Sequence, residues 1–258
     1  MKELFDEVAG QSRLDPQESA RQSSAPPKRK RFYKDAGVAE GDGGFTVTLD
    51  GKPIRTPSQT IVGVPSRVLA DAIAAEWNAQ QQFIDPLSMP LTRLANSVVQ
   101  GVAGREQIVA EDIAKYFGSD LLFYRAEFPD ELIAKQGEHW DPVLRWAADN
   151  LGAHFILVQG IMPVRQPEQS IAHARARLPS DAWRIGALHV VTTITGSALL
   201  ALALHMSVRD ADAIWAAAHV DEDWNAARWG ADEEVTARRA ARRRDFDAAV
   251  KVIEALPG

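Results

Sequence analysis

Two pairs of histidine and aspartate have the residue types needed for acid–base chemistry. His139 lies two residues before Asp141, and His219 lies two residues before Asp221. A histidine beside a carboxylate can serve as a general base, but catalysis also needs a nucleophile for it to activate. No nucleophile motif accompanies either pair. We therefore interpret both pairs as parts of surface helix junctions. A hydrolase-like enzyme built on such a pair, or on a carboxylate–metal site, remains the alternative.

Two runs of acidic residues, Asp221-Glu222-Asp223 and Asp232-Glu233-Glu234, repeat at a spacing of eleven. On an unbroken helix this spacing is about three turns, which would leave equivalent carboxylates about 20° apart on one face. Such a face could hold a divalent cation, although Gly230 can disrupt the register. The competing interpretation is electrostatic, because acids at a helix start complement its dipole and can pair with the arginines at 238–244. We favour this second interpretation and predict no metal site.

Tryptophans are the remaining candidates for a functional surface, since aromatic side chains often dominate protein interfaces. Trp77 follows Leu69 and Ile73 at helical spacing, which predicts that it lies in the core. Trp224 and Trp229 lie among the acids instead, which predicts a partly exposed contact surface.

Motifs that bind phosphate or carry catalysis are absent from the sequence. It contains no Walker A loop, no G-x-S-x-G elbow, no H-E-x-x-H pair and no G-x-G-x-x-G segment between a strand and a helix. The glycine-rich stretch at 41–44 precedes a predicted strand, so it lacks the helix N-terminus that would bind a phosphate. The sequence therefore predicts no catalytic residue, no cofactor and no bound nucleotide.

Composition narrows the class of protein further. The chain has 258 residues, is 46% hydrophobic, carries a net charge of −6 and contains no cysteine. That hydrophobic content supports a real core, and the negative charge argues against nucleic acid as a partner. Neither a signal peptide nor a transit peptide is indicated at the N-terminus, where acidic residues are frequent. These features predict an intracellular protein, bacterial cytoplasmic or, in a eukaryote, of the mitochondrial matrix.

The uncharged stretch 185–206, IGALHVVTTITGSALLALALHM, is the segment around which we expect the chain to be organised. Its apolar residues cover two sides of a helix, which predicts that the helix is buried on most of its surface. The length could span a bilayer, but His189, His205 and the charged flanks favour the centre of a helical domain, so we predict no stable membrane insertion. Gly196-Ser197 allows either a kink or a break into two helices.

The elements that must position these residues fall into two classes. Strands are predicted from 31 to 65, with a two-residue hairpin at Asp50-Gly51 that pairs Leu49 with Lys52 and Phe45 with Thr56. Helices are predicted from Ser66, a suitable N-cap, to the C-terminus. Among them, separate helices open at Pro129 and Pro142, and another opens at Ser207 and carries both Trp215 and Trp224.

These elements predict an α+β fold, a small N-terminal β-rich domain followed by a larger, mostly helical domain. The predicted divisions are a flexible N-terminal segment at 1–30, the β-rich domain at 31–65 and the helical domain at 66–258.

The ordered series of segments closely resembles a known family, the chaperones that assemble the catalytic head of F-type ATP synthase, of the alpha-subunit-binding (Atp-twelve) type. The segments that carry the resemblance are RFYKDAGV, GGFTVTLDGKPIRTP, LADAIAAEWNAQ, IDPLSMPLTRLANSV, DIAKYFGSDLLFYRAEFP, HWDPVLRW, SALLALAL and WGADEE. The resemblance runs from Arg31 nearly to the C-terminus. It implies a protein that is not an enzyme, binds the unassembled alpha subunit and shields it from aggregation until it joins beta.

The residues expected to contact the partner are the aromatic and acidic ones near the C-terminus. Trp229, Asp232, Glu233 and Glu234 form the main candidate, since an aromatic side chain and consecutive acids meet there at a predicted helix break. Asp221, Glu222 and Trp224 are the supporting candidates. We expect the protein itself to be a monomer.

Overall fold

The computed structural model describes residues 29–41, 44–160 and 162–256. Its contacts divide the chain into two compact units. In the described part of the first, Met1–Phe32 with Gln80–Asp85, a bridge pairs Lys30 with Phe83. The second unit, Tyr33–Ala79 with Pro86–Gly258, contains the strands and helices described below. Most of the predicted N-terminal segment 1–30 lies outside the described residues.

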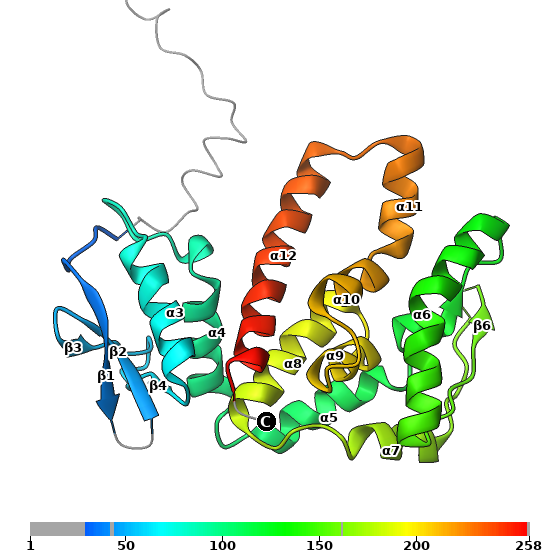
Figure 1. Cartoon of the computed structure of the whole chain (residues 1–258), viewed down its shortest axis with the longest axis horizontal. Coiled ribbons are helices and arrows are strands. Elements are labelled where there is room, and N and C mark those ends of the chain that lie inside the picture. Colours follow the sequence, from blue (N-terminus) through cyan, green and yellow to red (C-terminus); the bar gives the residue numbers. More distant parts are fainter. Residues whose placement is uncertain (1–28, 42–43, 161, 257–258) are drawn as a thin grey trace, which may run out of the picture. The chain divides into compact units, whose positions relative to one another are not determined.

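The second unit begins with a small antiparallel sheet (Figure 1). Strands β1 (Ala36–Gly41) and β2 (Gly44–Leu49) pair along their whole length, and β3 (Lys52–Pro53) and β4 (Gly63–Val64) both pair with the other side of β2. The first strand therefore begins later than the predicted residue 31. Two residues of the predicted glycine-rich turn, 42 and 43, lie outside the described residues.

The predicted hairpin at Asp50-Gly51 is confirmed. Both residues have positive φ, 48° and 80°, which is the conformation of the tight turn that suits twisted strands. Leu49 pairs with Lys52 as expected. The register further along the strand was predicted wrongly, because Phe45 pairs with Val64 of β4 rather than with Thr56. β3 is only two residues long, and the chain turns back through 56–60 so that β4 takes its place.

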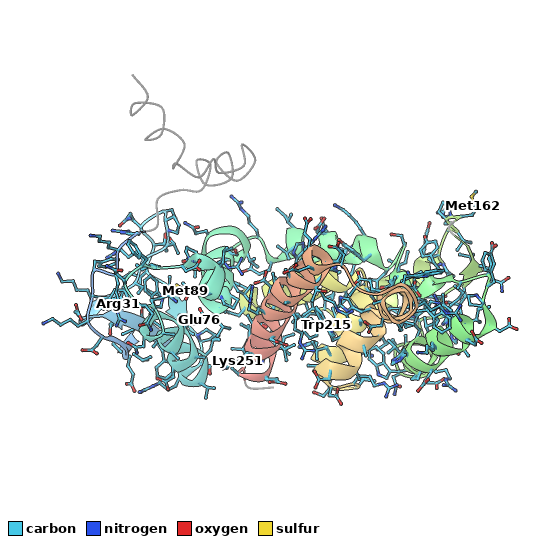
Figure 2. The ribbon with its side chains drawn as sticks, turned by 90° about the horizontal axis from the view of Figure 1, so that it is seen from above. Arg31, Glu76, Met89, Met162, Trp215 and Lys251 are labelled. Atoms are coloured by element: carbon cyan, nitrogen blue, oxygen red, sulfur yellow. The ribbon has the colours of Figure 1, made fainter. Side chains whose placement is uncertain are left out.

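Helix α3 (Arg67–Asn78) covers β1 and β2. Ser66 is its N-cap as predicted, and its hydroxyl accepts the Leu69 N–H at 3.4 Å. Glu76, which is labelled in Figure 2, links this helix to the next one, since its carboxylate accepts the N–H groups of Leu91 and Thr92 at 2.7 and 2.8 Å. Those groups open α4 (Pro90–Ser97), whose N-cap Met89 has no side-chain acceptor. Burial raises the pKa of Glu76.

The helical part continues with short connecting segments. A 3₁₀ turn, Pro86–Ser88, precedes α4, and a π-helical segment, Val98–Val102, follows it. Helix α5 (Glu106–Tyr116) leads to the 3₁₀ turn Leu121–Phe123. Strand β5 (Tyr124–Arg125) pairs in parallel with β6 (Val158–Gln159). Helix α7 (Glu168–Arg175) follows β6.

Helix α6 (Asp130–Leu151) contains Pro142 in its interior, so the prediction of separate helices at Pro129 and Pro142 is wrong. A proline there removes one main-chain hydrogen bond, but packing on both sides of it holds the helix together. Trp140 and Val143 are both 1% exposed, and the Trp140 indole N–H donates to Ala217 O at 2.7 Å.

The uncharged central stretch forms two helices, α8 (Ala182–Thr195) and α9 (Ala198–His205). Gly196 has φ 69° and ends the first, while the Ser197 hydroxyl caps the second. Of the two possibilities at these residues, a kink or a break, the structure has the break. Seven consecutive residues of α9 are buried. In the part of the chain that the structure describes, no helix has both the length and the apolar character needed to cross a membrane.

The C-terminal part consists of α10 (Ala211–Ala218), α11 (Val220–Trp229) and α12 (Glu233–Glu254). Asp210, not Ser207, caps α10, and the chain breaks again at His219, so the predicted single helix is two helices. Trp215, which is labelled in Figure 2, contacts Phe246 of α12 with ring centroids 5.2 Å apart. The α+β fold, with a small N-terminal sheet and a larger helical part, is confirmed.

Candidate partner-binding surface

The loop between α11 and α12 brings the candidate contact residues to one helix break (Figure 1). Gly230 has φ 80° and ψ 164°, a conformation that a residue with a side chain rarely adopts, and it ends α11. Asp232 then opens α12, and its carboxylate accepts the N–H groups of Glu234 and Val235 at 2.8 and 3.3 Å. We call residues 229–235 the hairpin tip.

Apolar side chains at the hairpin tip are open to solvent. Trp229 is 83% exposed and Val235 is 49% exposed. Tryptophan is usually well buried, because removing its large apolar surface from water is favourable. An indole left in water beside a second apolar side chain is a feature of surfaces that are covered by a partner.

The three acids of the hairpin tip have different roles. Asp232 is used as the helix cap, and Glu234 lies 3.6 Å from Arg238, an exposed pair one turn along α12. Glu233 is exposed, and in the described parts of the chain its carboxylate has neither an ion-pair nor a hydrogen-bond partner. Because Asp232 already caps the helix, a carboxylate at position 233 contributes to the fold only through the helix dipole, about 0.3–1 kcal/mol.

The acids of α11 are engaged with the rest of the protein. Asp223 pairs with Arg239 of α12, and Glu222 lies 3.5 Å from Arg242. Asp221 accepts a hydrogen bond from the buried amide of Gln136 at 2.8 Å. These contacts hold α11 against α12 and α6.

Trp224 also packs within the protein. The Arg228 guanidinium lies 4.4 Å from the centroid of its ring and the Lys135 ammonium lies 5.5 Å from it. Arg228 in turn pairs with Glu131 at 3.0 Å, so the ring is part of the junction between α11 and α6. Of the predicted contact residues, the structure brings Trp229, Asp232, Glu233 and Glu234 together at the tip. Asp221, Glu222 and Trp224 lie at helix junctions.

The eleven-residue spacing of the acidic runs does not place them on one helix face. The break at Gly230 puts one run on α11 and the other at the start of α12. Across residues 29–41, 44–160 and 162–256, no group of three or more histidine and acidic side chains is arranged to hold a metal ion.

His139 and Asp141 lie within α6, where residues two positions apart point in different directions. Asp141 pairs with Arg125 at 2.6 Å. His139 lines a separate small cavity of about 200 Å³ with Val143 and Arg209. The pair therefore does not have the geometry of a base held by a carboxylate.

His219 is buried in the junction between α10 and α11. Its Nδ1 lies 2.7 Å from Trp215 O, a carbonyl acceptor, so Nδ1 carries the proton. Nε2 lies 3.9 Å from Glu222 rather than near Asp221. Burial lowers the pKa of His219, which keeps the ring neutral at neutral pH.

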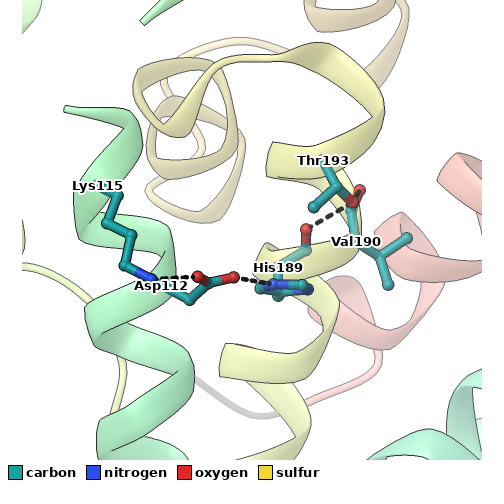
Figure 3. Close-up of polar contacts among 5 residues, drawn as sticks. All are labelled: Asp112, Lys115, His189, Val190 and Thr193. Carbon is teal, nitrogen blue, oxygen red and sulfur yellow. Dashed lines mark hydrogen bonds and ion pairs between the residues drawn. The ribbon is translucent and has the colours of Figure 1, made fainter. Parts of the chain in front are cut away.

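The closest His–carboxylate pair in the described structure was not predicted. His189 Nε2 of α8 lies 2.9 Å from Asp112 Oδ2 of α5, and Lys115 contacts the other carboxylate oxygen at 2.9 Å (Figure 3). The hydrogen bond from His189 lowers the pKa of Asp112. Thr193 is the nearby hydroxyl, but it donates to the main-chain carbonyls of His189 and Val190. The arrangement therefore ties α5 to α8 and offers no activated nucleophile.

A second unpredicted carboxylate, Asp120, is fully buried. It accepts the Leu122 N–H at 3.2 Å and the Leu199 N–H of α9 at 3.0 Å. Burial raises its pKa to about 6. The sequence around Asp120 shows only an aspartate before an apolar run. That pattern indicates a local cap, but it does not reveal a contact with a residue 79 positions further along the chain.

Comparison with known proteins agrees with this architecture. A family model described as ATP12 chaperone protein matches residues 30–148. The structure of the Atu1473 protein of Agrobacterium tumefaciens has a TM-score of 0.85 and 46% identity, covering 95% of this chain and 93% of that one. Atp12 of Paracoccus denitrificans has a TM-score of 0.81 and 39% identity, covering 88% and 98%. Mitochondrial atp12 of Schizosaccharomyces pombe is 22% identical over 221 residues, 81% of this chain and 76% of that protein.

The α+β architecture is the one seen in the Paracoccus Atp12 structure. The match to the family model and the 39% identity over nearly all of the Paracoccus protein are specific to one group. The chain belongs to the ATP12 chaperone family, as its sequence segments indicated, and is a chaperone of F1-ATPase assembly.

Proposed function

We propose that the protein binds the unassembled alpha subunit of the ATP synthase catalytic head, and that the hairpin tip is part of the contact surface. The observation that carries the surface assignment is the 83% exposed indole of Trp229, beside a Glu233 carboxylate that the described structure leaves without a partner. An aromatic anchor with an uncommitted charge beside it is typical of an interface hot spot.

Chemistry at the tip indicates what it would contact. The indole buries apolar area on the client, and Glu233 favours a basic side chain beside that area. An unassembled subunit exposes apolar area that drives aggregation, and covering this area prevents it. The proper partner must then displace the chaperone, so the contact should be of moderate affinity.

Binding alone is sufficient for this role. We propose that the protein acts without catalysis or cofactor, as a monomer, in the bacterial cytoplasm or, in a eukaryote, in the mitochondrial matrix. The residues that a hydrolase would use have other partners in the structure. Asp141 pairs with Arg125, and the buried His219 donates its Nδ1 proton to the Trp215 carbonyl.

The test uses purified alpha subunit of the same organism. Aggregation of the dilute subunit, followed by light scattering, should be suppressed by one equivalent of the chaperone, and size-exclusion chromatography should show a one-to-one complex. Trp229→Ser should weaken both effects about tenfold, as expected for a hot-spot residue. Ile108→Ser is the matched control, because Ile108 is an apolar side chain of α5 that is 64% exposed. Unchanged suppression by Trp229→Ser would remove the tip from the contact surface, and no complex with the wild type would refute the proposed partner.

A further inference from the structure

Strand β1 is an edge of the sheet that the structure describes (Figure 1). Among the described residues it pairs only with β2, whose other side is taken by β3 and β4. In an antiparallel pair, alternate residues direct both main-chain groups toward the partner strand and the residues between them direct both groups away. The register of β1 against β2 therefore decides which groups of β1 face outward.

The register identifies those groups. The Val47 carbonyl of β2 accepts the Ile54 N–H at 2.8 Å on the β3 side, so Val47 does not bond to its β1 neighbour Val38. Ala36, Val38 and Glu40 accordingly direct their N–H and C=O groups away from β2. The residues between them, Gly37, Ala39 and Gly41, bond to β2.

At Ala36, the outward main-chain groups are already hydrogen-bonded to a side chain, that of Asn78. The Asn78 amide at the end of α3 accepts the Ala36 N–H and donates to the Ala36 carbonyl, both at 2.8 Å. This double hydrogen bond is the one a neighbouring strand would make, which independently confirms the outward orientation of Ala36. It also marks where an added strand would have to end.

Beyond Asn78 the edge is open. The described residues provide no hydrogen-bond partner for the main-chain groups of Val38 or Glu40. Edges of this kind are normally protected by lysine, proline or a bulge, and the sequence of β1, AGVAEG, has none of these. Its small residues give an incoming backbone free access, and Glu40 is its single charge.

We propose that the β1 edge binds an extended segment of the client subunit as an added strand, starting beside Asn78 and pairing with Val38 and Glu40. This inference rests on the proposed function. Main-chain recognition suits an extended segment, because it uses backbone groups that every segment has, and Glu40, with Asp35 before the strand, favours a segment that carries lysine or arginine. The edge is a second contact, on the sheet and not at the hairpin tip.

Hydrogen exchange on the wild-type protein tests the proposal without any substitution. The amides of Val38 and Glu40 should exchange quickly in the free chaperone, and saturating purified alpha subunit should slow them at least about tenfold, because each would then donate to the added strand. The amides of Gly37 and Ala39 are the internal control, since they bond to β2 in both states. Unchanged exchange at Val38 and Glu40 in a demonstrated complex would overturn the proposal.

Two substitutions at one position separate the main chain from the side chain. Val38→Pro removes an outward N–H that the sheet does not use, so the fold should persist while the affinity for the alpha subunit falls about tenfold or more. Val38→Ala keeps the N–H and should bind as the wild type does. Equal binding by a folded Val38→Pro variant would contradict the edge assignment. If that variant does not fold, the hydrogen-exchange experiment on the wild type is the test of the proposal.

Other outcomes have distinct meanings. If the wild type does not bind the alpha subunit at all, the proposed function fails, and this inference fails with it. If the wild type binds but Val38→Pro binds equally well, only the edge assignment fails. If the chaperone dimerises as its concentration rises and Val38→Pro abolishes the dimer, the occupant of the edge is a second copy of this chain, which overturns the assignment to the client.

Discussion

Asp120 and Glu233 are both acids at the start of a helical segment, but one is buried and hydrogen-bonded while the other is exposed to solvent. Asp120 is fully buried and accepts main-chain N–H groups from two separate elements. Glu233 is exposed and has no partner in the described residues. The same side-chain chemistry thus holds the α8–α9 centre together in one place and is free for a partner in the other. Stability should depend on the first region and client binding on the second.

The strongest test of the buried region is Asp120→Asn. The amide offers one acceptor where the carboxylate offers two, so at least one buried N–H group loses its partner, which costs about 1–3 kcal/mol at pH 7. Urea denaturation of wild type and variant measures the loss. Asp149→Asn, an exposed position of α6, controls for the change in charge.

Acidity sharpens this test, because the pKa of Asp120 is raised in the folded state from 3.8 to about 6. The folded protein binds the proton more tightly than the unfolded chain, so the stabilisation from this group is full below about pH 4 and is lost as the pH rises to about 6. The deficit of Asp120→Asn relative to wild type should therefore grow by about 2 kcal/mol between pH 6 and pH 4. A deficit that stays constant, or shrinks on acidification, would show that Asp120 titrates normally.

Trp77→Arg should have the next largest effect. Trp77 is half-buried, its ring lies 5.5 Å from the Tyr33 ring, and its carbonyl accepts the Tyr33 hydroxyl at 2.7 Å. Arginine would lose the ring contact and place a charge against the sheet, which should cost about 2–3 kcal/mol of unfolding free energy. Trp77→Phe keeps an aromatic ring and should cost less. An unchanged melting temperature for Trp77→Arg would make this residue a contact candidate instead.

Whether a structural feature could be predicted from the sequence depends on how far apart in the chain the interacting residues lie. The turn at Asp50-Gly51, the cap at Ser66 and the break at Gly196-Ser197 depend on neighbouring residues, and all three were predictable. Pro142 was predicted to start a helix because a proline usually does not lie inside one. The helix continues through it because Trp140 packs against α10, a contact between distant residues that the sequence does not reveal.

The same reasoning applies to the candidate surface. Trp229 and the acids beside it are visible in the sequence as a cluster at a helix break. Which acids are free is not visible, since Asp223 meets Arg239 across a hairpin and Asp221 meets Gln136, 85 residues away. Asp120 was missed for this reason, because its second hydrogen bond joins residues 79 positions apart.

Between the two extremes lies the Asp223–Arg239 pair on the sides of the hairpin. The Arg239 side chain is 28% exposed and that of Asp223 is 50% exposed, so solvent screens the pair. A double-mutant cycle with Asp223→Ala and Arg239→Ala should give a coupling energy of about 0.5–1 kcal/mol. A coupling of several kcal/mol would mean that the hairpin is held as firmly as the α8–α9 centre, and the contrast between the regions would disappear.

Glu233→Lys tests the central claim most directly, because it changes the hairpin tip without touching a contact that the fold uses. Its unfolding free energy should fall by no more than about 1 kcal/mol, because a lysine in the first turn of α12 opposes the helix dipole but breaks no hydrogen bond or ion pair. Glu254→Lys makes the same change of charge at an exposed position about 30 Å away along α12 and serves as the control. We expect the folded Glu233→Lys variant to lose capture of purified alpha subunit and suppression of its aggregation, while Glu254→Lys retains both. Full capture by folded Glu233→Lys would contradict the account.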